Sequence, residues 1–309
     1  MPTLITQNAA HVKEDLADII SMISPEETPF TSAVGKAKAS AKTHEWTRDE
    51  LAAVNKDNSA VEGADAADAT LITPTRLSNQ TQIFTKTIAV SDTFEATKIA
   101  GGKSELARQI MKAGKEIKRD QEAAFLSANP SVASGARKLG GAEAWISTNA
   151  LHGANGATIG YSGGAVGAVA AGTARPFTEA MLITALQGAY TAGGNVTTIM
   201  APPSLKAKIG TFNGGATKQA IADGKKTINV GVDIYNGDFG RQDIVASRFM
   251  TTTTVLAFDE ELWKIAVLRG LSKTELAKTG DATKFQLVTE VTLESLNESG
   301  SAKIADLNG

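Results

Sequence analysis

The chain has 309 residues, enough for one large domain or two smaller domains with a substantial hydrophobic core. Its formal net charge of −2 gives no overall attraction to polyanions, which argues against a dedicated DNA-reading domain and leaves nucleic-acid contact to a local basic patch. No cysteine is present, so disulfides and thiolate metal sites are excluded and stability must come from packing and association.

Apolar runs and terminal signals give the expected environment. No run approaches the ~18 apolar residues that span a bilayer. Residues 1–10 lack the basic-then-apolar order of a secretory signal. We therefore expect a soluble protein that is made in the cytoplasm and has no membrane partner.

Residues 11–23 carry apolar side chains at three- and four-residue spacings: Val12, Leu16, Ile19, Ile20 and Ile23. The spacing predicts a short amphipathic helix, which Pro25 and Pro29 then end. Its apolar stripe could cover a neighbouring subunit, with Leu16, Ile19 and Ile20 as contacts, or pack on its own domain. The sequence leaves both interpretations open.

Residues 36–82 form a long stretch that is too poor in large apolar side chains to build its own core; these are Trp46, Leu51, Val54, Val61, Leu71, Ile72 and Leu77. Part of its charge is divided, a pattern that could pair with a neighbouring subunit: Lys36, Lys38, Lys42 and Arg48 lie on one side, and Asp49, Glu50, Asp57, Glu62, Asp65 and Asp68 lie on the other. We predict subunit contacts, beyond those of the preceding helix, at Lys36, Lys38, Lys42, Trp46, Arg48, Asp65 and Asp68. The stretch indicates an assembling protein rather than a catalyst.

Two regular elements are expected next along the chain. Residues 82–91 alternate as a strand, with Phe84, Ile88 and Val90 mostly on one face. Residues 103–127 carry a helical apolar stripe and predict the longest helix, at roughly 35 Å a structural beam across the subunit. Its basic residues are either a solvated face or a non-specific phosphate contact: Lys112, Lys115, Lys118 and Arg119.

The glycine-rich residues 134–175 predict loop with short strands, because their ten glycines disfavour regular structure. A compact mixed domain follows, with helices expected over 178–190 and near 204–212. Strands are expected over 196–200, 228–234, 244–249 and 252–258, and alternation indicates further strands at 263–267 and 285–293. The order of elements predicts an α+β fold.

Two short segments resemble catalytic or phosphate-binding motifs, but each lacks a residue that its motif requires. Gly160 to Gly164 matches G-x-S-x-G around Ser162, but all three histidines precede this serine, whereas a nucleophile elbow needs a histidine after it. Gly102-Lys103-Ser104 resembles the end of a phosphate loop, yet Thr97 stands where that motif requires glycine. His44 beside Glu45 is interpreted as a surface or subunit contact. We predict no enzyme, no metal site and no cofactor.

Three segments carry a family resemblance. They are residues 15–52, residues 61–66 (VEGADA) and residues 137–149 (RKLGGAEAWISTN). Together they resemble tailed-bacteriophage major capsid proteins of the HK97-like fold, in particular the SU10-type major head protein family, and the similarity runs through most of the chain. Lysine–asparagine crosslinking occurs in some members of the wider fold, but no position here can be assigned to it.

The resemblance implies a division of the chain into the parts of that fold. Residues 1–35 would be an N-terminal arm, 36–85 an extended E-loop, and 86–135 a peripheral domain whose spine helix is 103–127. Residues 136–176 would be a glycine-rich connection, 177–261 an axial domain, and 262–309 a return to the peripheral domain.

The implied function is a major capsid protein that assembles into pentamers and hexamers of an icosahedral shell around double-stranded DNA. The chain would be assembled in the bacterial host cytoplasm and reside in the virion. Implied partners are other copies of itself and packaged DNA, with portal, scaffold and decoration proteins as further candidates. Two alternatives stay in play: an encapsulin-like shell around cargo protein, and a serine hydrolase using Ser162.

Overall fold

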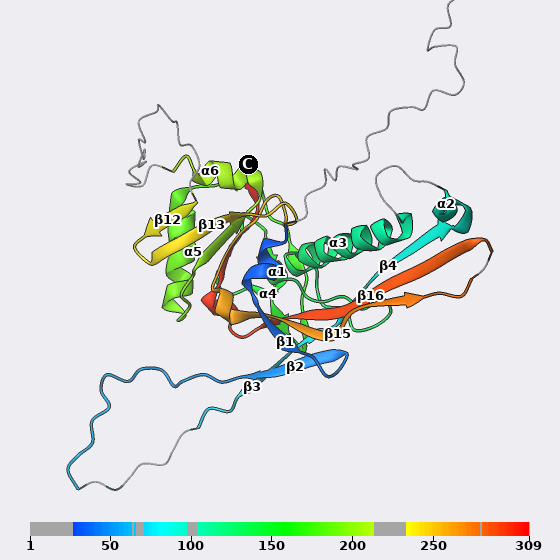
Figure 1. Cartoon of the computed structure of the whole chain (residues 1–309). Helices are drawn as coiled ribbons and strands as arrows, with labels where there is room; N and C mark the ends of the chain where they lie inside the picture. Colours follow the sequence, from blue (N-terminus) through cyan, green and yellow to red (C-terminus); the bar gives the residue numbers. More distant parts are fainter. Residues whose placement is uncertain are drawn as a thin grey trace, which may run out of the picture.

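A computed structural model describes residues 27–63, 65, 71–97, 104–212, 233–278 and 280–308. A four-stranded sheet carries the longest helix, a six-stranded sheet carries two further helices, and an extended loop leaves the body (Figure 1). Helix and sheet are mixed, so the predicted α+β class is confirmed. The predicted helix over 11–23 lies outside the described residues.

The four-stranded sheet has the order β1-β15-β16-β4. Its members are β1 (Gly35–Lys38), β15 (Trp263–Glu275), β16 (Ala282–Ser295) and β4 (Gln82–Ser91). β1 runs parallel to β15, and the other neighbours are antiparallel. The strand predicted over 82–91 is confirmed, and Phe84, Ile88 and Val90 are buried on its inner face as expected.

Helix α3 (Glu105–Phe125) packs on β4 and β16 and matches the helix predicted over 103–127. Ser104 caps it by accepting a hydrogen bond from Ala107 N at 3.2 Å. Its 21 residues span about 32 Å, and its apolar stripe, including Ile117 and Phe125, is buried. At the end of strand β4, a short helix α2 (Asp92–Ala96) precedes it.

Helix α1 (Pro29–Ala33) is fixed by a buried carboxylate from the last turn of α3. Glu122 accepts hydrogen bonds from Phe30 N at 2.7 Å and from Thr31 N at 2.8 Å. Burial raises the pKa of Glu122, and the hydrogen bonds from Thr31 and Phe30 only partly offset this effect. The Phe30 ring packs among the rings of Phe125, Phe258 and Trp263.

The six-stranded sheet has the order β12-β13-β11-β14-β17-β5. Its strands are β12 (Ile234–Gly237), β13 (Gly240–Ala246), β11 (Thr198–Ala201), β14 (Val255–Phe258), β17 (Ala302–Ile304) and β5 (Ala150–Leu151). The strands predicted at 196–200, 244–249 and 252–258 are therefore present with shifted ends. Most of the strand predicted over 228–234 lies outside the described residues.

Two predicted helices pack with this sheet: α5 (Glu179–Thr191) and α6 (Pro203–Ile209). Leu182, Leu186 and Leu205 join the buried core beneath them. Thr178 occupies the N-cap position of α5 but makes no side-chain capping hydrogen bond. Gly193, with a φ of +85°, ends the helix in the left-handed conformation that favours glycine.

The glycine-rich connection contains a short helix α4 (Ala142–Trp145) and then a narrow hairpin. Strand β6 (Ala157–Thr158) pairs with β9 (Val169–Ala170), and β7 (Tyr161–Ser162) pairs with β8 (Ala165–Val166). Gly163 and Gly164 turn the tip with φ of +61° and +85°, which a two-residue hairpin turn requires. The prediction of loop with short strands is confirmed.

The C-terminal part of the chain is shared between the two sheets. β15 and β16 contain the strands predicted at 263–267 and 285–293 and lie in the four-stranded sheet, and 3-10 turns flank them at Glu260–Leu262 and Glu298–Gly300. Residues 302–308 instead join the other half: β17 enters the six-stranded sheet, and β18 (Leu307–Asn308) pairs with β10 (Arg175–Pro176). β17 has only three residues, too few for a periodic pattern to separate it from the preceding strands.

Candidate functional site: the extended loop and its anchor

The extended loop is carried by a two-stranded ladder of β2 (Thr43–Arg48) and β3 (Thr75–Gln80). Between them, the described residues 49–63, 65 and 71–74 form the loop tip, which lies away from the body and is drawn as the blue and cyan trace (Figure 1). Five large apolar side chains of the loop are exposed: Leu51 (98%), Val54 (98%), Val61 (79%), Leu71 (85%) and Ile72 (51%). The prediction that this stretch cannot bury its own apolar surface is confirmed for these five residues.

Trp46 and Leu77 behave differently from the other apolar residues of the stretch. They pair across the ladder, and both pack against the body of their own chain. Trp46 Nε1 donates to Ser295 O at 2.9 Å, and its ring lies 5.6 Å from the Trp145 ring. Trp46 therefore rests on the core of its own chain through this face of the ladder, and the predicted subunit contact at Trp46 stays a prediction.

The predicted charged contacts lie at separate places. Lys36 and Lys38 are exposed on β1, away from the loop tip, while Lys42 is exposed where the ladder begins. Arg48 pairs with Glu50 at 2.7 Å. Asp65 is exposed within the loop. The other predicted contacts lie outside the described residues: Leu16, Ile19, Ile20 and Asp68.

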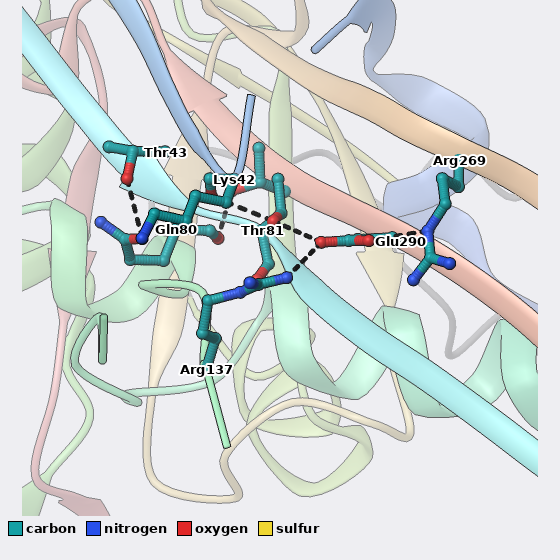
Figure 2. A network of polar contacts seen from close by, with 8 residues as sticks. Lys42, Thr43, Gln80, Thr81, Arg137, Arg269 and Glu290 are labelled. Atoms are coloured by element: carbon teal, nitrogen blue, oxygen red, sulfur yellow. Dashed lines mark hydrogen bonds and ion pairs between the residues drawn. The ribbon is translucent and has the colours of Figure 1, made fainter. Parts of the chain in front are cut away.

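The base of the loop is anchored by a buried carboxylate (Figure 2). Glu290 of β16 lies between two arginines, accepting from Arg269 Nε at 2.8 Å and from Arg137 Nη2. Thr81, directly after β3, places its hydroxyl 2.7 Å from Glu290 Oε1 and 3.0 Å from the backbone oxygen of Lys42. One carboxylate thus joins the loop base, the sheet and the glycine-rich connection.

The environment of Glu290 keeps this carboxylate ionised. Burial favours the neutral form, but hydrogen bonds from Thr81 and Arg269 and the charges of the two arginines outweigh it and lower the pKa of Glu290. Its side chain is only 4% exposed, so water can do little to replace these partners. The buried charge of Glu290 therefore holds its partners in place, because the loss of any one of them would leave a buried charge without compensation and lower the stability of the fold.

Asn79 adds a second tie between the ladder and the body. Its Nδ2 donates to Gly140 O at 3.1 Å and to Leu293 O at 2.8 Å, while its Oδ1 accepts from Gly140 N at 2.8 Å. The side chain is 1% exposed and imitates a backbone pair. Sequence reasoning missed Asn79, Arg137, Arg269 and Glu290; the one usable signal was a charged residue within the alternating apolar pattern of 285–293.

The catalytic candidates have structural partners instead of catalytic ones. Ser162 is exposed beside the hairpin turn, which leads into another short strand and not into the helix that a nucleophile elbow requires. His44 Nε2 lies 3.0 Å from Glu294 Oε2 within the same chain, and the predicted surface or subunit contact of His44 stays a prediction. In the described ranges, no group of three potential metal ligands is found. No helix there is long and apolar enough to cross a membrane.

The fold matches solved capsid structures along nearly its whole length. The capsid of a native GTA particle superposes with a TM-score of 0.68 at 13% identity, covering 99% of this chain and 100% of the other. The Cyanophage A-1(L) capsid gives 0.65 at 14% identity with the same coverage. A Mycobacterium phage Adephagia chain gives 0.61 at 12% identity, covering 100% and 99%. The class is therefore that of HK97-like capsid subunits, with a long helix beside one sheet and an extended loop.

The family follows from sequence comparison. The family model for the SU10 major capsid protein matches residues 3–308. A major capsid protein of Escherichia phage Phieco32 is 32% identical, with 97% of this chain and 96% of that protein covered. The chain belongs to the SU10 major capsid protein family, and its function is that of a phage major capsid protein in the virion.

Proposed function

We propose that the chain assembles with copies of itself into pentamers and hexamers of an icosahedral shell around double-stranded phage DNA. The observation that carries the proposal is the loop, which displays five exposed large apolar side chains on a rigidly anchored base. Such surface on a soluble subunit is typical of a protein interaction site. Repetition by symmetry then sums many modest contacts into a closed container.

The parts of the chain take the corresponding proposed roles. Residues 1–35 act as the arm, 36–85 as the E-loop, and α3 as the spine of the peripheral domain. The six-stranded sheet and its helices act as the axial domain, which here includes residues 302–308 as well as 177–261. Assembly would take place in the host cytoplasm, with portal, scaffold and decoration proteins as candidate partners.

DNA contact is proposed as non-specific and local. The net charge of −2 supplies no bulk attraction, so the basic residues of α3 are the candidates within the described chain. Within α3, Lys112 pairs with Glu116 at 3.9 Å, which reduces the positive charge that the helix offers, while Asp120 of α3 is paired with Lys86 of β4 at 3.1 Å. No specific observation favours the encapsulin-like alternative or the hydrolase.

Negative-stain microscopy of the purified chain over a concentration series tests the proposal. We expect uniform closed shells, or pentamers and hexamers, above a threshold concentration. Monomers at every concentration and salt condition would contradict self-assembly. Esterase activity that is lost in Ser162→Ala would instead favour the hydrolase.

A further inference from the structure

One carboxylate closes both ends of the hairpin formed by residues 153–172. Asp306 accepts hydrogen bonds from Gly153 N at 3.0 Å and from Gly172 N at 2.8 Å. His152 Nδ1 lies 3.0 Å from the same carboxylate. Burial opposes ionisation, but the hydrogen bonds from Gly172, Gly153 and His152 outweigh it and lower the pKa of Asp306. The base of the hairpin is therefore tied to the segment just after β17.

A second set of contacts fixes the first strand of the hairpin. Thr158 Oγ1 lies 2.8 Å from His152 Nε2 and also accepts from Lys303 Nζ, which donates to Glu143 O at 2.6 Å. With neutral His152, Nδ1–H donates to Asp306 while Nε2 accepts the Thr158 hydroxyl proton. Each of these contacts then joins one donor to one acceptor, and Lys303 is fully buried among them.

The middle of the hairpin is packed closely against the body. Val166 N donates to Ser131 Oγ at 2.8 Å, and Ser131 N donates to Val166 O at 3.0 Å. Gly140 lies so close to Val166 that an added Cβ would come within 2.6 Å of its side chain. The hairpin has little room to move relative to these neighbours.

The tip of the hairpin contacts strand β3 of the loop ladder directly, and it is linked to strand β2 through the ring of Trp145. On β3, Ser78 Oγ donates to Gly164 O at 3.2 Å and lies 3.1 Å from Tyr161 Oη. The Tyr161 ring stacks on Trp145 with a centroid distance of 5.4 Å and an interplanar angle of 1°. Trp145 in turn contacts Trp46 of β2 at 5.6 Å.

We propose that the glycine-rich hairpin is a strut that sets the direction in which the extended loop leaves the body. Asp306 holds the base of the strut, and Ser78 and Tyr161 make the contact at its tip. Asp306 is therefore a positioning residue for the loop, although its own hydrogen bonds lie at the opposite end of the hairpin. The part of the proposal that concerns the role of the loop rests on the proposed assembly function, whereas the contacts between the hairpin and the ladder do not.

Amide hydrogen exchange on the dilute, unassembled subunit tests the strut independently of assembly. In Asp306→Asn we expect the ladder amides of 43–48 and 75–80 to exchange about tenfold faster, since a charged hydrogen-bond acceptor is lost. The β15 and β16 amides should keep their rates. Asp259→Asn is the matched control, because Asp259 accepts from Glu261 N at 3.0 Å within a 3-10 turn.

A double-variant comparison separates a strut from general loosening. In a Ser78→Ala/Tyr161→Phe background the tip contact is already broken, so Asp306→Asn should add less than about twofold to ladder exchange. Ser91→Ala, which removes the capping hydroxyl of α2, is the control for loss of a serine. Unchanged ladder exchange in Asp306→Asn, or full additivity in the double background, overturns the proposal. If Asp306→Asn does not fold, unchanged ladder exchange in Ser78→Ala/Tyr161→Phe overturns it.

Discussion

The tip and the base of the extended loop differ in burial and in the number of contacts with the rest of the chain. At the tip, large side chains such as Leu51 and Val54 are almost fully exposed at 98% each. At the base, Asn79 and Glu290 are buried and each makes several hydrogen bonds. The contrast shows that the base is fixed within the subunit, while the described part of the chain leaves these side chains of the loop tip uncovered. Substitutions at the two regions should therefore separate folding from assembly.

The largest expected effect on folding is at the anchor. Glu290→Ala leaves Arg137 and Arg269 without their shared carboxylate, which we expect to lower the free energy of unfolding by about 3 kcal/mol. Denaturant unfolding of the unassembled subunit measures this. The exposed Glu275→Ala is the control and should stay within about 0.5 kcal/mol of the wild type. Equal effects of the two substitutions would contradict the anchor.

Trp46 and Leu51 lie only five positions apart but should respond differently. Trp46→Ala removes a ring packed on Trp145 and a hydrogen bond to Ser295, so we expect a loss of about 2 to 3 kcal/mol in unfolding free energy. Leu51→Ala should change it by less than about 0.5 kcal/mol. Similar losses for both would show that the tip is covered within its own chain.

The pH dependence of stability should report the anchor as well. The pKa of Glu290 is lower in the folded chain, so its stabilisation is complete above the unfolded value of about 4.3 and is lost as the pH falls through the folded value. Glu290→Gln should therefore lose less stability than the wild type on acidification from about pH 5 to about pH 3. Parallel curves for the two proteins would contradict an ionised anchor.

The pKa shift of Glu122 has the opposite direction to that of Glu290. Burial raises the pKa of Glu122, so its contribution to stability is complete below the unfolded value and is lost as the pH rises through the folded value. Glu122→Gln should remove that loss while leaving the acid-side loss from Glu290 in place. Thermal melts across the acid range of both variants measure the two trends. The same trend in both would mean that one assignment is wrong.

The smallest effect expected on the subunit comes from reversing charge on the loop. Asp65→Lys/Asp68→Lys should leave the melting temperature unchanged and lower the yield of particles several-fold, because the divided charge of the stretch would set the register between subunits. Asp238→Lys/Glu275→Lys changes the net charge equally at exposed positions elsewhere. Normal particle yield in the loop variant would show that electrostatic pairing is not used.

Sequence patterns predicted the local helices and strands well because the apolar periodicity of such an element depends only on residues that are close together in the chain. The helix over 103–127 and the strand over 82–91 are present within two residues of the expected ends. Exposure of the loop tip also followed from its composition. These features depend on side chains that are close in the chain.

Features that depend on distant pairs were not predictable in the same way. Glu290 and Arg137 are separated by 153 positions, and the sequence near either residue contains no pattern that predicts their contact. The contact between Trp46 and Trp145 was likewise not predictable, because Trp145 lies far along the chain, in the glycine-rich connection. β17 (Ala302–Ile304) lies in the six-stranded sheet and β18 (Leu307–Asn308) pairs with β10, because long-range strand pairing, which a single sequence does not display, decides their place.

The most direct measurement compares assembly and folding in one variant of the loop tip. In Leu51→Ser/Val54→Ser/Leu71→Ser/Ile72→Ser, we expect a subunit with the melting temperature of the wild type that forms no closed particles in microscopy or sedimentation. The matched control is Met111→Ser/Ile159→Ser, which removes exposed apolar side chains on α3 and on the hairpin. Wild-type particles from the loop variant would contradict the account.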